Sequence, residues 1–180
     1  MTTFVALLRG VNVGKAKRVP MAEFRKLLAG LGHKEVVTLL NSGNAVFRSK
    51  SVAPARIASD IAAAIARKLK VEVPVIVKSA KEIAAIVADN PFEVGALDHS
   101  RFLVVFTQDS ATLAELAAIA SLVTPPERFA IGRHAAYLYC TDGILKSKAG
   151  ESVLGKVGRR ATTRNLATTL KLHALAGTSA

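Results

Sequence analysis

The residues in this sequence that could do chemistry are mainly cations, amides and hydroxyls in three short polar segments. The first segment follows an apolar run and reads Gly10-Val-Asn-Val-Gly14-Lys15, with further cations directly after it. A nucleotide-hydrolysing phosphate loop has four residues between its glycines and a hydroxyl residue after its lysine. Here three residues intervene and Ala16 follows the lysine, which excludes that enzyme class. What remains is a strand-to-helix loop that could cradle an anion, or an ordinary turn.

The second polar segment, residues 41–44, reads Asn-Ser-Gly-Asn between two apolar runs and predicts a β-hairpin. Turn chemistry alone explains these residue types. In a β-α-β-β arrangement with neighbouring antiparallel strands, the first loop and this hairpin leave the same end of the sheet. We therefore expect the following polar residues to gather on one rim: Arg9, Asn12, Lys15, Ser42 and Asn44.

The third polar segment, residues 161–165, reads Ala-Thr-Thr-Arg-Asn. One of its threonines is a natural N-cap for a final helix that the spacing predicts from about Thr163 to Ala176. Arg164 would then lie in the first turn and oppose the helix dipole, so that an acidic side chain or a bound anion should offset it. Ser147 and Lys148 lie upstream and could join such a site.

Groups for catalysis or metal binding are sparse. The four histidines show no metal-binding spacing, so we expect neither a metal nor a cofactor. The single cysteine, Cys140, lies in a strand-like run and is expected to be buried. One cysteine cannot form an internal disulfide, which suits a reducing compartment. Ser147 beside Lys148 could be a nucleophile with its base, but adjacent strand residues point to opposite faces.

The net charge of +12 over 180 residues is concentrated in two windows. Residues 9–26 carry six Lys or Arg against one Glu, and residues 144–173 carry seven against one. Such clusters favour anionic partners, including nucleic acid, although a solvated basic face is the alternative. The apolar run at the N-terminus breaks at Arg9, too early for a signal peptide or a membrane span. We therefore expect a cytoplasmic protein with no membrane partner.

The order of predicted elements favours an α+β fold of two tandem ferredoxin-like (β-α-β-β-α-β) subdomains packed into one unit. The expected boundaries are 1–89 for the first subdomain, 90–100 for a connector and 101–180 for the second, which includes the terminal helix. The second half shows no clean strand for the sixth element of this pattern, and residues 160–162 are the only room for one. Residues 101–106 are apolar on both strand faces, so the other half or a partner chain should cover the second face.

Five stretches of this chain form a recognisable series: LLRGVNVGKAKRVPM (7–21), NSGNAVF (41–47), NPF (90–92), DGILKSK (142–148) and ATTRN (161–165). The series resembles the bacterial family catalogued as domain of unknown function 1697. The resemblance implies two ferredoxin-like subdomains and no established activity. Two positions depart from the family pattern, because Ala16 replaces a frequent Gly and Leu166 replaces an aromatic residue.

These observations predict a module that binds a phosphate-bearing small molecule or a nucleic acid through basic polar loops. The expected ligand-binding residues are Arg9, Asn12, Lys15, Lys17, Arg18, Ser42, Asn44, Ser147, Lys148, Thr163, Arg164 and Asn165. An enzyme that acts on a small anionic metabolite, with Ser147, Lys148 and Arg164 near the chemistry, is one alternative. A structural protein that forms a homodimer through an apolar sheet face is another.

Overall fold

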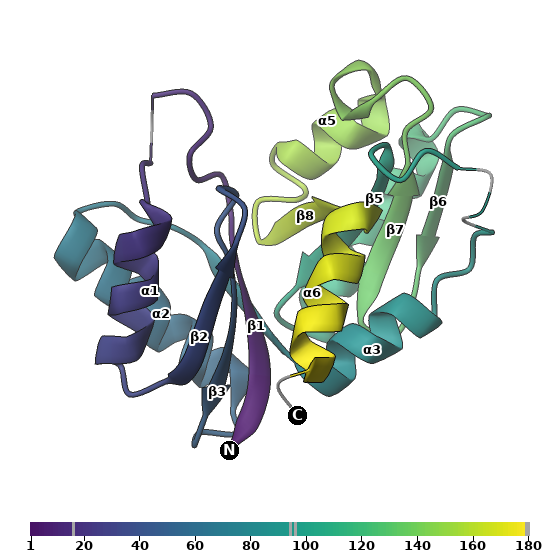
Figure 1. The fold of residues 1–180 in the computed structure, drawn as a ribbon. Helices are drawn as coiled ribbons and strands as arrows, with labels where there is room; N and C mark the ends of the chain where they lie inside the picture. Colours follow the sequence, from purple (N-terminus) through teal and green to yellow (C-terminus); the bar gives the residue numbers. More distant parts are fainter. Residues whose placement is uncertain (16, 94, 96, 179–180) are drawn as a thin grey trace. The chain divides into compact units, whose positions relative to one another are not determined.

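Two four-stranded antiparallel sheets and their helices make up the fold of this chain, as a computed structural model shows (Figure 1). The structure describes residues 1–15, 17–93, 95 and 97–178. Ala16, one of the two departures from the family pattern, therefore lies outside the described residues, as do residues 94 and 96 of the predicted connector. The mixed α+β class predicted from the sequence is confirmed.

The chain divides into two compact units, Met1–Ile83 with Leu172–Ala180, and Ala84–Lys171. In the first unit the sheet order is β2-β3-β1-β4, and all neighbouring strands are antiparallel. Its strands are β1 (Thr2–Leu8), β2 (Lys34–Leu39), β3 (Asn44–Ser49) and β4 (Val75–Ser79). The hairpin expected at residues 41–44 joins β2 to β3 and is confirmed.

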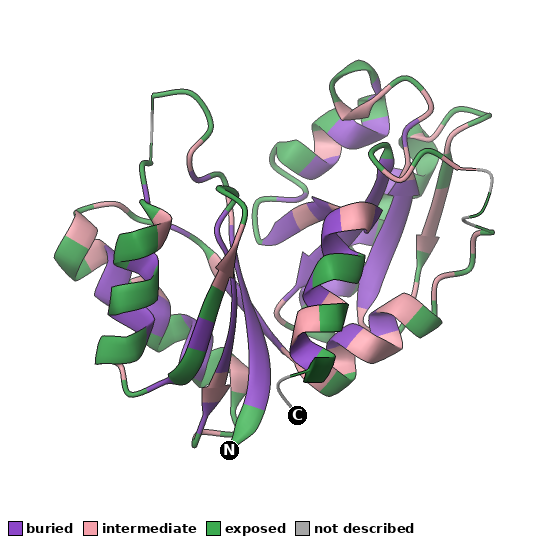
Figure 2. Cartoon of the chain, viewed as in Figure 1, coloured by how far each residue is buried: buried purple, intermediate pink, exposed green. Residues whose placement is uncertain are grey.

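Helices α1 (Met21–Gly30) and α2 (Pro54–Leu69) pack on one face of this sheet (Figure 1). Pro54 occupies the first turn of α2, where its fixed φ suits the helix and no N–H is required. Alternate β1 residues such as Phe4 enter a core with Phe24 of α1 and Ile61 of α2. The intervening β1 residues, such as Val5 and Leu7, are buried too (Figure 2).

The second unit repeats the strand pattern with the order β6-β7-β5-β8, again antiparallel throughout. Its strands are β5 (Phe102–Thr107), β6 (Arg128–Ile131), β7 (Ala135–Tyr139) and β8 (Ala161–Asn165). Its helices are α4 (Ser110–Glu115), the 3₁₀ helices η1 (Leu116–Leu122) and η2 (Ile144–Lys146), and α5 (Lys148–Leu154). All six β5 residues are buried, as the apolar sequence on both faces predicts.

The prediction that no clean strand forms the last element of the second half is wrong. Residues Ala161–Asn165 form β8, which pairs with β5 so that Arg164 lies opposite Val104. The final helix, α6, therefore begins at Leu166 rather than near Thr163 and runs to Thr178. Two adjacent β-branched threonines suit a strand, and pairing with a buried central strand decides between strand and helix cap.

The division between the two units falls inside α3 (Ala80–Ala88) and inside α6. Helix α3 begins with the capping box that Ser79 and Glu82 predict. Glu82 N donates to Ser79 Oγ at 3.2 Å, and Ser79 N donates to Glu82 Oε2 at 2.8 Å. No helix among the described residues is long and apolar enough to cross a membrane.

Candidate functional site

The loop after β1 and the β2–β3 turn meet at one end of the first sheet, as expected. Leu8 N, at the end of β1, donates to Gly43 O at 2.8 Å. Asn12 Nδ2 donates to Asn41 O at 2.7 Å. We call this surface, residues 9–15, 17–20 and 41–44, the N-terminal rim. The hydrogen bonds join two segments that lie about thirty residues apart in the sequence.

Asn12 holds the shape of the rim. Its Nδ2 donates to Val19 O at 2.9 Å as well as to Asn41 O, and its Oδ1 accepts from Val19 N at 2.9 Å. Asn12 N also donates to Lys17 O at 3.2 Å. The backbone of Asn12 has φ +57°, a conformation that asparagine tolerates better than most residues. Asn12 therefore closes the loop on itself and fastens it to the hairpin.

Gly43 permits the hairpin to lie directly against the end of β1. Its φ is +78°, and a Cβ placed there would lie 2.6 Å from Leu8 Cβ and 2.8 Å from Val11 Cγ2. Behind it, the buried Asn44 side chain donates to Leu39 O and to Ser42 Oγ, both at 2.9 Å. Ser42 and Asn44, which the sequence suggested as ligand contacts, thus brace the turn itself.

A cavity of about 230 Å³ lies in the N-terminal rim. It is lined by Asn12, Gly14, Arg18, Pro20 and Asn41. Arg18 is exposed and supplies a positive charge, and none of these lining residues carries a carboxylate. The cation Arg18 and the lack of a carboxylate among these residues make the cavity suited to an anion.

The cavity also borders the start of α1, because the lining residue Pro20 is the N-cap of that helix. The N-cap residue Pro20 offers no side-chain hydrogen bond to the first N–H groups of α1. These groups and the helix dipole attract negative charge. Glu23, the acidic residue of the first turn, is exposed and pairs with Lys26 at 3.0 Å.

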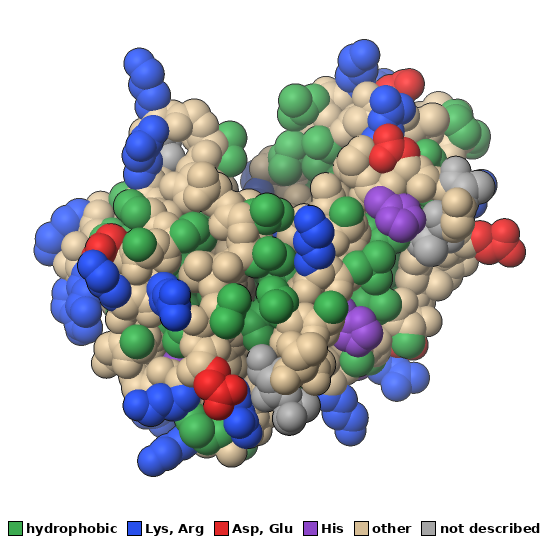
Figure 3. Space-filling view, viewed as in Figure 1, with side chains coloured by type: hydrophobic (Ala, Val, Ile, Leu, Met, Phe, Trp, Pro, Cys, Tyr) green, Lys and Arg blue, Asp and Glu red, His purple; other side chains and the backbone are tan. Residues whose placement is uncertain are grey.

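The rim carries further cations besides Arg18. Lys15 and Lys17 are exposed, and Arg9 is half-buried at the end of β1. Burial lowers the pKa of the Arg9 guanidinium below its usual value. Arg9 also anchors the loop, because its backbone N–H donates to Pro74 O at 3.0 Å. Lys and Arg side chains gather over α1 and the loop before it (Figure 3).

In the second unit, Arg164 is buried on β8 and is not the first-turn helix residue that the sequence suggested. Its Nη1 donates to Thr162 Oγ1 at 2.9 Å and to Thr163 O at 2.7 Å. Burial lowers the pKa of Arg164 to about 10, so that the guanidinium is still charged at neutral pH. The supposed conflict with the dipole of α6 therefore does not arise.

Ser147 and Asn165 serve as helix N-caps. Ser147 Oγ accepts from Gly150 N at 3.0 Å at the start of α5, and Asn165 Oδ1 accepts from Thr168 N at 2.9 Å at the start of α6. Ser147 is buried, whereas Lys148 is the exposed first residue of α5. The expectation that these two neighbours lie on a strand is wrong, because they begin a helix. Because Ser147 is buried and Lys148 is exposed, the two side chains are poorly placed to act as a nucleophile and its base.

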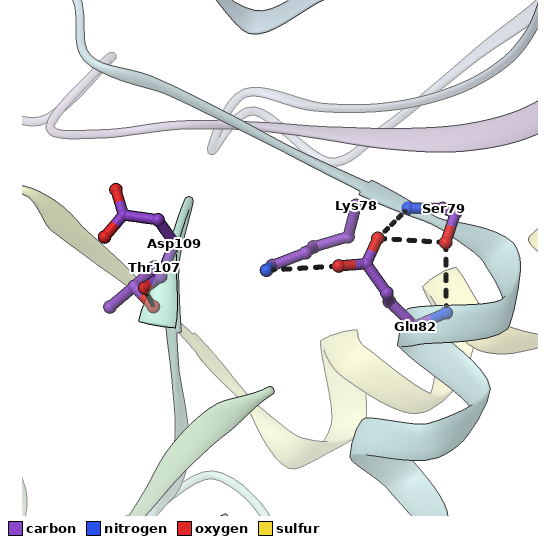
Figure 4. A network of polar contacts seen from close by, with 5 residues as sticks. All are labelled: Lys78, Ser79, Glu82, Thr107 and Asp109. Carbon is purple, nitrogen blue, oxygen red and sulfur yellow. Dashed lines mark hydrogen bonds and ion pairs between the residues drawn. The ribbon is translucent and has the colours of Figure 1, made fainter. Parts of the chain in front are cut away.

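One polar cluster in the first unit was not singled out from the sequence as a candidate site. Lys78 on β4 is only 4% exposed, and its Nζ lies 3.4 Å from Glu82 Oε1 (Figure 4). Burial raises the pKa of Glu82, but hydrogen bonds from Ser79 and the charge of Lys78 outweigh burial and lower it overall. The only sequence signal was a lysine inside an apolar strand, four residues before the capping glutamate.

Figure 4 also labels two residues of the second unit, Thr107 and Asp109. Thr107 Oγ1 donates to Asp109 O at 3.1 Å, and Asp109 Oδ1 accepts from Thr112 N at 2.7 Å. Asp109 is therefore the N-cap of α4. Hydrogen bonds from Thr112 lower the pKa of its carboxyl, as expected for a cap.

The described residues favour neither a metal site nor a reactive thiol. No cluster of His, Cys, Asp or Glu among the described residues could hold a metal ion. Cys140 is buried, as predicted, and burial raises the pKa of its thiol. A thiol with a raised pKa is a poor nucleophile at neutral pH.

Comparison with known proteins connects this geometry to one family. The chain resembles the solved structure of a conserved bacterial protein from Streptococcus pneumoniae, with a TM-score of 0.82 and 24% identity over 97% of this chain and 98% of that one. That likeness shows a shared fold. None of the curated proteins matches this chain. The model of the family described as "Protein of unknown function (DUF1697)" matches residues 1–137, which contain the whole N-terminal rim. The chain therefore belongs to the DUF1697 family.

Proposed function

We propose that this protein binds a phosphate-bearing or other anionic ligand at the N-terminal rim. The observation that carries the proposal is the cavity lined by Arg18, Asn12 and Pro20, with no carboxylate among its lining residues. Asn12 supports a rigid wall, because its amide is already bonded to Val19 and Asn41. A site that is formed before binding loses little conformational entropy on binding.

The size of the cavity favours recognition of one anionic group. Small-molecule sites usually enclose about 300–1,000 Å³, and this cavity encloses about 230 Å³. A phosphate group fits such a volume, whereas a whole nucleotide would extend beyond it. We therefore propose that the rim holds the phosphate of a larger ligand and that Lys15 and Lys17 contact what lies outside the cavity.

We further propose that the two halves of the chain each have the ferredoxin-like arrangement, with the boundaries 1–89, 90–100 and 101–180 expected from the sequence. The strand orders β2-β3-β1-β4 and β6-β7-β5-β8 support this arrangement, since each follows from the same β-α-β-β-α-β element order. In this arrangement the sheet holds the ends of its loops in place, whereas the residue types in the loops can differ from one protein to another.

Calorimetric titration with inorganic phosphate and with a phosphomonoester tests the proposal. We expect saturable binding by the native protein and a dissociation constant about tenfold to a hundredfold weaker in Arg18→Gln, because one charge-assisted hydrogen bond contributes about 1.5–3 kcal/mol. Arg25→Gln is the matched control: Arg25 is an exposed arginine of α1 that does not line the cavity. Equal losses in both variants, or no binding by the native protein, would contradict the proposal.

A nucleic acid could present the same phosphate chemistry. Titration of single-stranded RNA at several salt concentrations separates the two ligand classes. If the ligand is nucleic acid, the affinity should fall steeply with salt, because bound cations release counterions from the backbone. A binding constant for RNA that barely changes with salt would favour the small phosphate-bearing ligand.

A further inference from the structure

A second surface, in the other unit, has the properties of a protein-binding groove. A depression of about 500 Å³ lies between α5, the turn that follows it and the end of η1. Leu122 and Val157 give this groove its apolar part, while Lys148 and Lys156 line it with positive charge beside Glu151. We call it the α5 groove. None of its lining residues belongs to the N-terminal rim.

Several apolar side chains on and around the short helices of the α5 groove are exposed to solvent. Leu122 and Val157 are each 37% exposed, Leu154 is 44% exposed, and Leu145 on η2 is 85% exposed. Both η1 and η2 pack against α5, and of these four side chains Leu122 and Val157 line the groove. Figure 3 shows hydrophobic side chains together with Lys or Arg over α5. Clustered apolar exposure of this kind is typical of interaction sites.

The backbone fixes the floor of the groove. A Cβ at Gly158 would lie 1.8 Å from Val153 O, so the turn after α5 folds tightly back on the helix. Gly158 N donates to Ser152 O at 3.2 Å, and Gly155 N donates to Glu151 O at 2.8 Å. At the other end of α5, a Cβ at Gly150 would lie 2.3 Å from Ile144 O. Such close contacts leave the groove little freedom to collapse.

The charge of the residues around the α5 groove indicates which kind of partner it would bind. Residues 144–160 carry five Lys or Arg and a single acid, Glu151. One of these cations, Arg160, is paired with Glu115 at 2.5 Å, and the others are exposed. A second copy of this chain, at +12 overall, would be repelled. An acidic partner is attracted.

The shape and composition of the groove distinguish among acidic partners. No aromatic residue is among the residues that line it, so bases of a nucleic acid would have no stacking surface there. A lipid surface is engaged by projecting side chains, whereas a depression receives one. We infer that the α5 groove binds an acidic segment of a partner protein, with one apolar side chain inserted between Leu122 and Val157 and its carboxylates facing Lys148 and Lys156.

Fluorescence anisotropy with a labelled peptide tests this inference on the full chain. The probe has two adjacent leucines flanked by glutamates; the comparison peptides have serines in place of the leucines, or lysines in place of the glutamates. We expect saturable binding of the probe alone. Equal binding of the serine peptide would overturn the inference, since it would leave only non-specific charge attraction, and so would a complete lack of probe binding at low salt.

Variants locate the binding. Lys148→Glu with Lys156→Glu should weaken probe binding by about tenfold or more, because rim charges steer and hold an acidic partner. The control is Lys34→Glu with Lys50→Glu, which makes the same charge change at exposed positions of the first unit and should retain the native affinity. Val157→Asp tests the apolar contact at an exposed turn position and should weaken probe binding as well. Equal weakening by both double variants, or stronger binding to phosphatidylserine vesicles or single-stranded RNA than to the probe, would refute the assignment.

Discussion

Replacement of Asn12 tests whether one side chain holds the N-terminal rim together. The substitution Asn12→Ala removes three hydrogen bonds, two donated to Val19 O and Asn41 O and one accepted from Val19 N. At about 0.5–1.5 kcal/mol each, their loss should lower the free energy of unfolding by about 2–4 kcal/mol. The partial exposure of Asn12 places the expected value toward the lower end, because water can replace part of the lost bonding.

The backbone of Asn12 allows a matched comparison. Since its φ is +57°, alanine should be strained there and glycine should not. Asn12→Gly loses the same hydrogen bonds, so it should be about 1 kcal/mol more stable than Asn12→Ala. Urea unfolding followed by circular dichroism measures all three proteins. If Asn12→Ala lies within about 0.5 kcal/mol of the native protein, the amide does not hold the rim and the reasoning fails.

Three further substitutions probe other contacts. Gly43→Ala should destabilise the protein by about 2–4 kcal/mol, since it combines a positive φ with a clash against Leu8; urea unfolding measures this. Tyr137→Phe should lower the free energy of unfolding by about 1–3 kcal/mol, because Ile86 O loses the buried hydroxyl that donates to it at 2.6 Å. The pKa of Glu82 is lower in the folded chain than in the unfolded chain, where it is near 4.5. Ionised Glu82 therefore contributes to the free energy of unfolding above about pH 4.5, and this contribution is lost as the pH falls through the folded pKa. Glu82→Gln should therefore flatten the loss of stability measured by urea unfolding below about pH 4.5.

The controls for these substitutions also come from the chain. Gly10 has φ +63°, but a Cβ placed there would have nothing within 4 Å, so Gly10→Ala isolates the backbone term from the clash at Gly43. Equal destabilisation at both glycines would mean that contact with β1 does not matter.

Burial raises the pKa of Tyr137 to about 12, so the hydroxyl should not titrate below about pH 11. An ultraviolet titration with a normal tyrosine midpoint for both tyrosines would contradict that burial.

Local patterns in the sequence were sufficient for the elements that local chemistry decides. The Asn-Ser-Gly-Asn turn, the capping box of α3 and the proline start of α2 all follow from contacts within a few residues. The convergence of the first loop with the hairpin followed from strand directions and is confirmed by the bond between Leu8 N and Gly43 O. Strand β8 was missed because its threonines suit a helix cap equally well, and only its pairing with β5 decides.

The roles of individual polar residues were harder to predict than their positions. The sequence predicts Asn12, Asn44 and Asn165 as ligand contacts, yet the side chain of each forms hydrogen bonds with backbone groups of the folded chain. Residue type shows that a group can form hydrogen bonds, but the partner depends on the folded backbone. The burial of Lys78 could not be predicted from its residue type either, because burial depends on the elements that pack around β4. Arg18, by contrast, lines the cavity of the N-terminal rim and carries an exposed charge there.

The location of phosphate binding tests the central proposal most directly. Titration of the ¹⁵N-labelled protein with inorganic phosphate, followed by amide chemical shifts, reports which backbone groups sense the anion. We expect saturable shifts concentrated at Asn12, Gly14 and the first residues of α1, and their loss in Arg18→Gln but not in Arg25→Gln. Shifts that are absent, or that spread evenly over exposed Lys and Arg across both units, would contradict an anion site at the N-terminal rim.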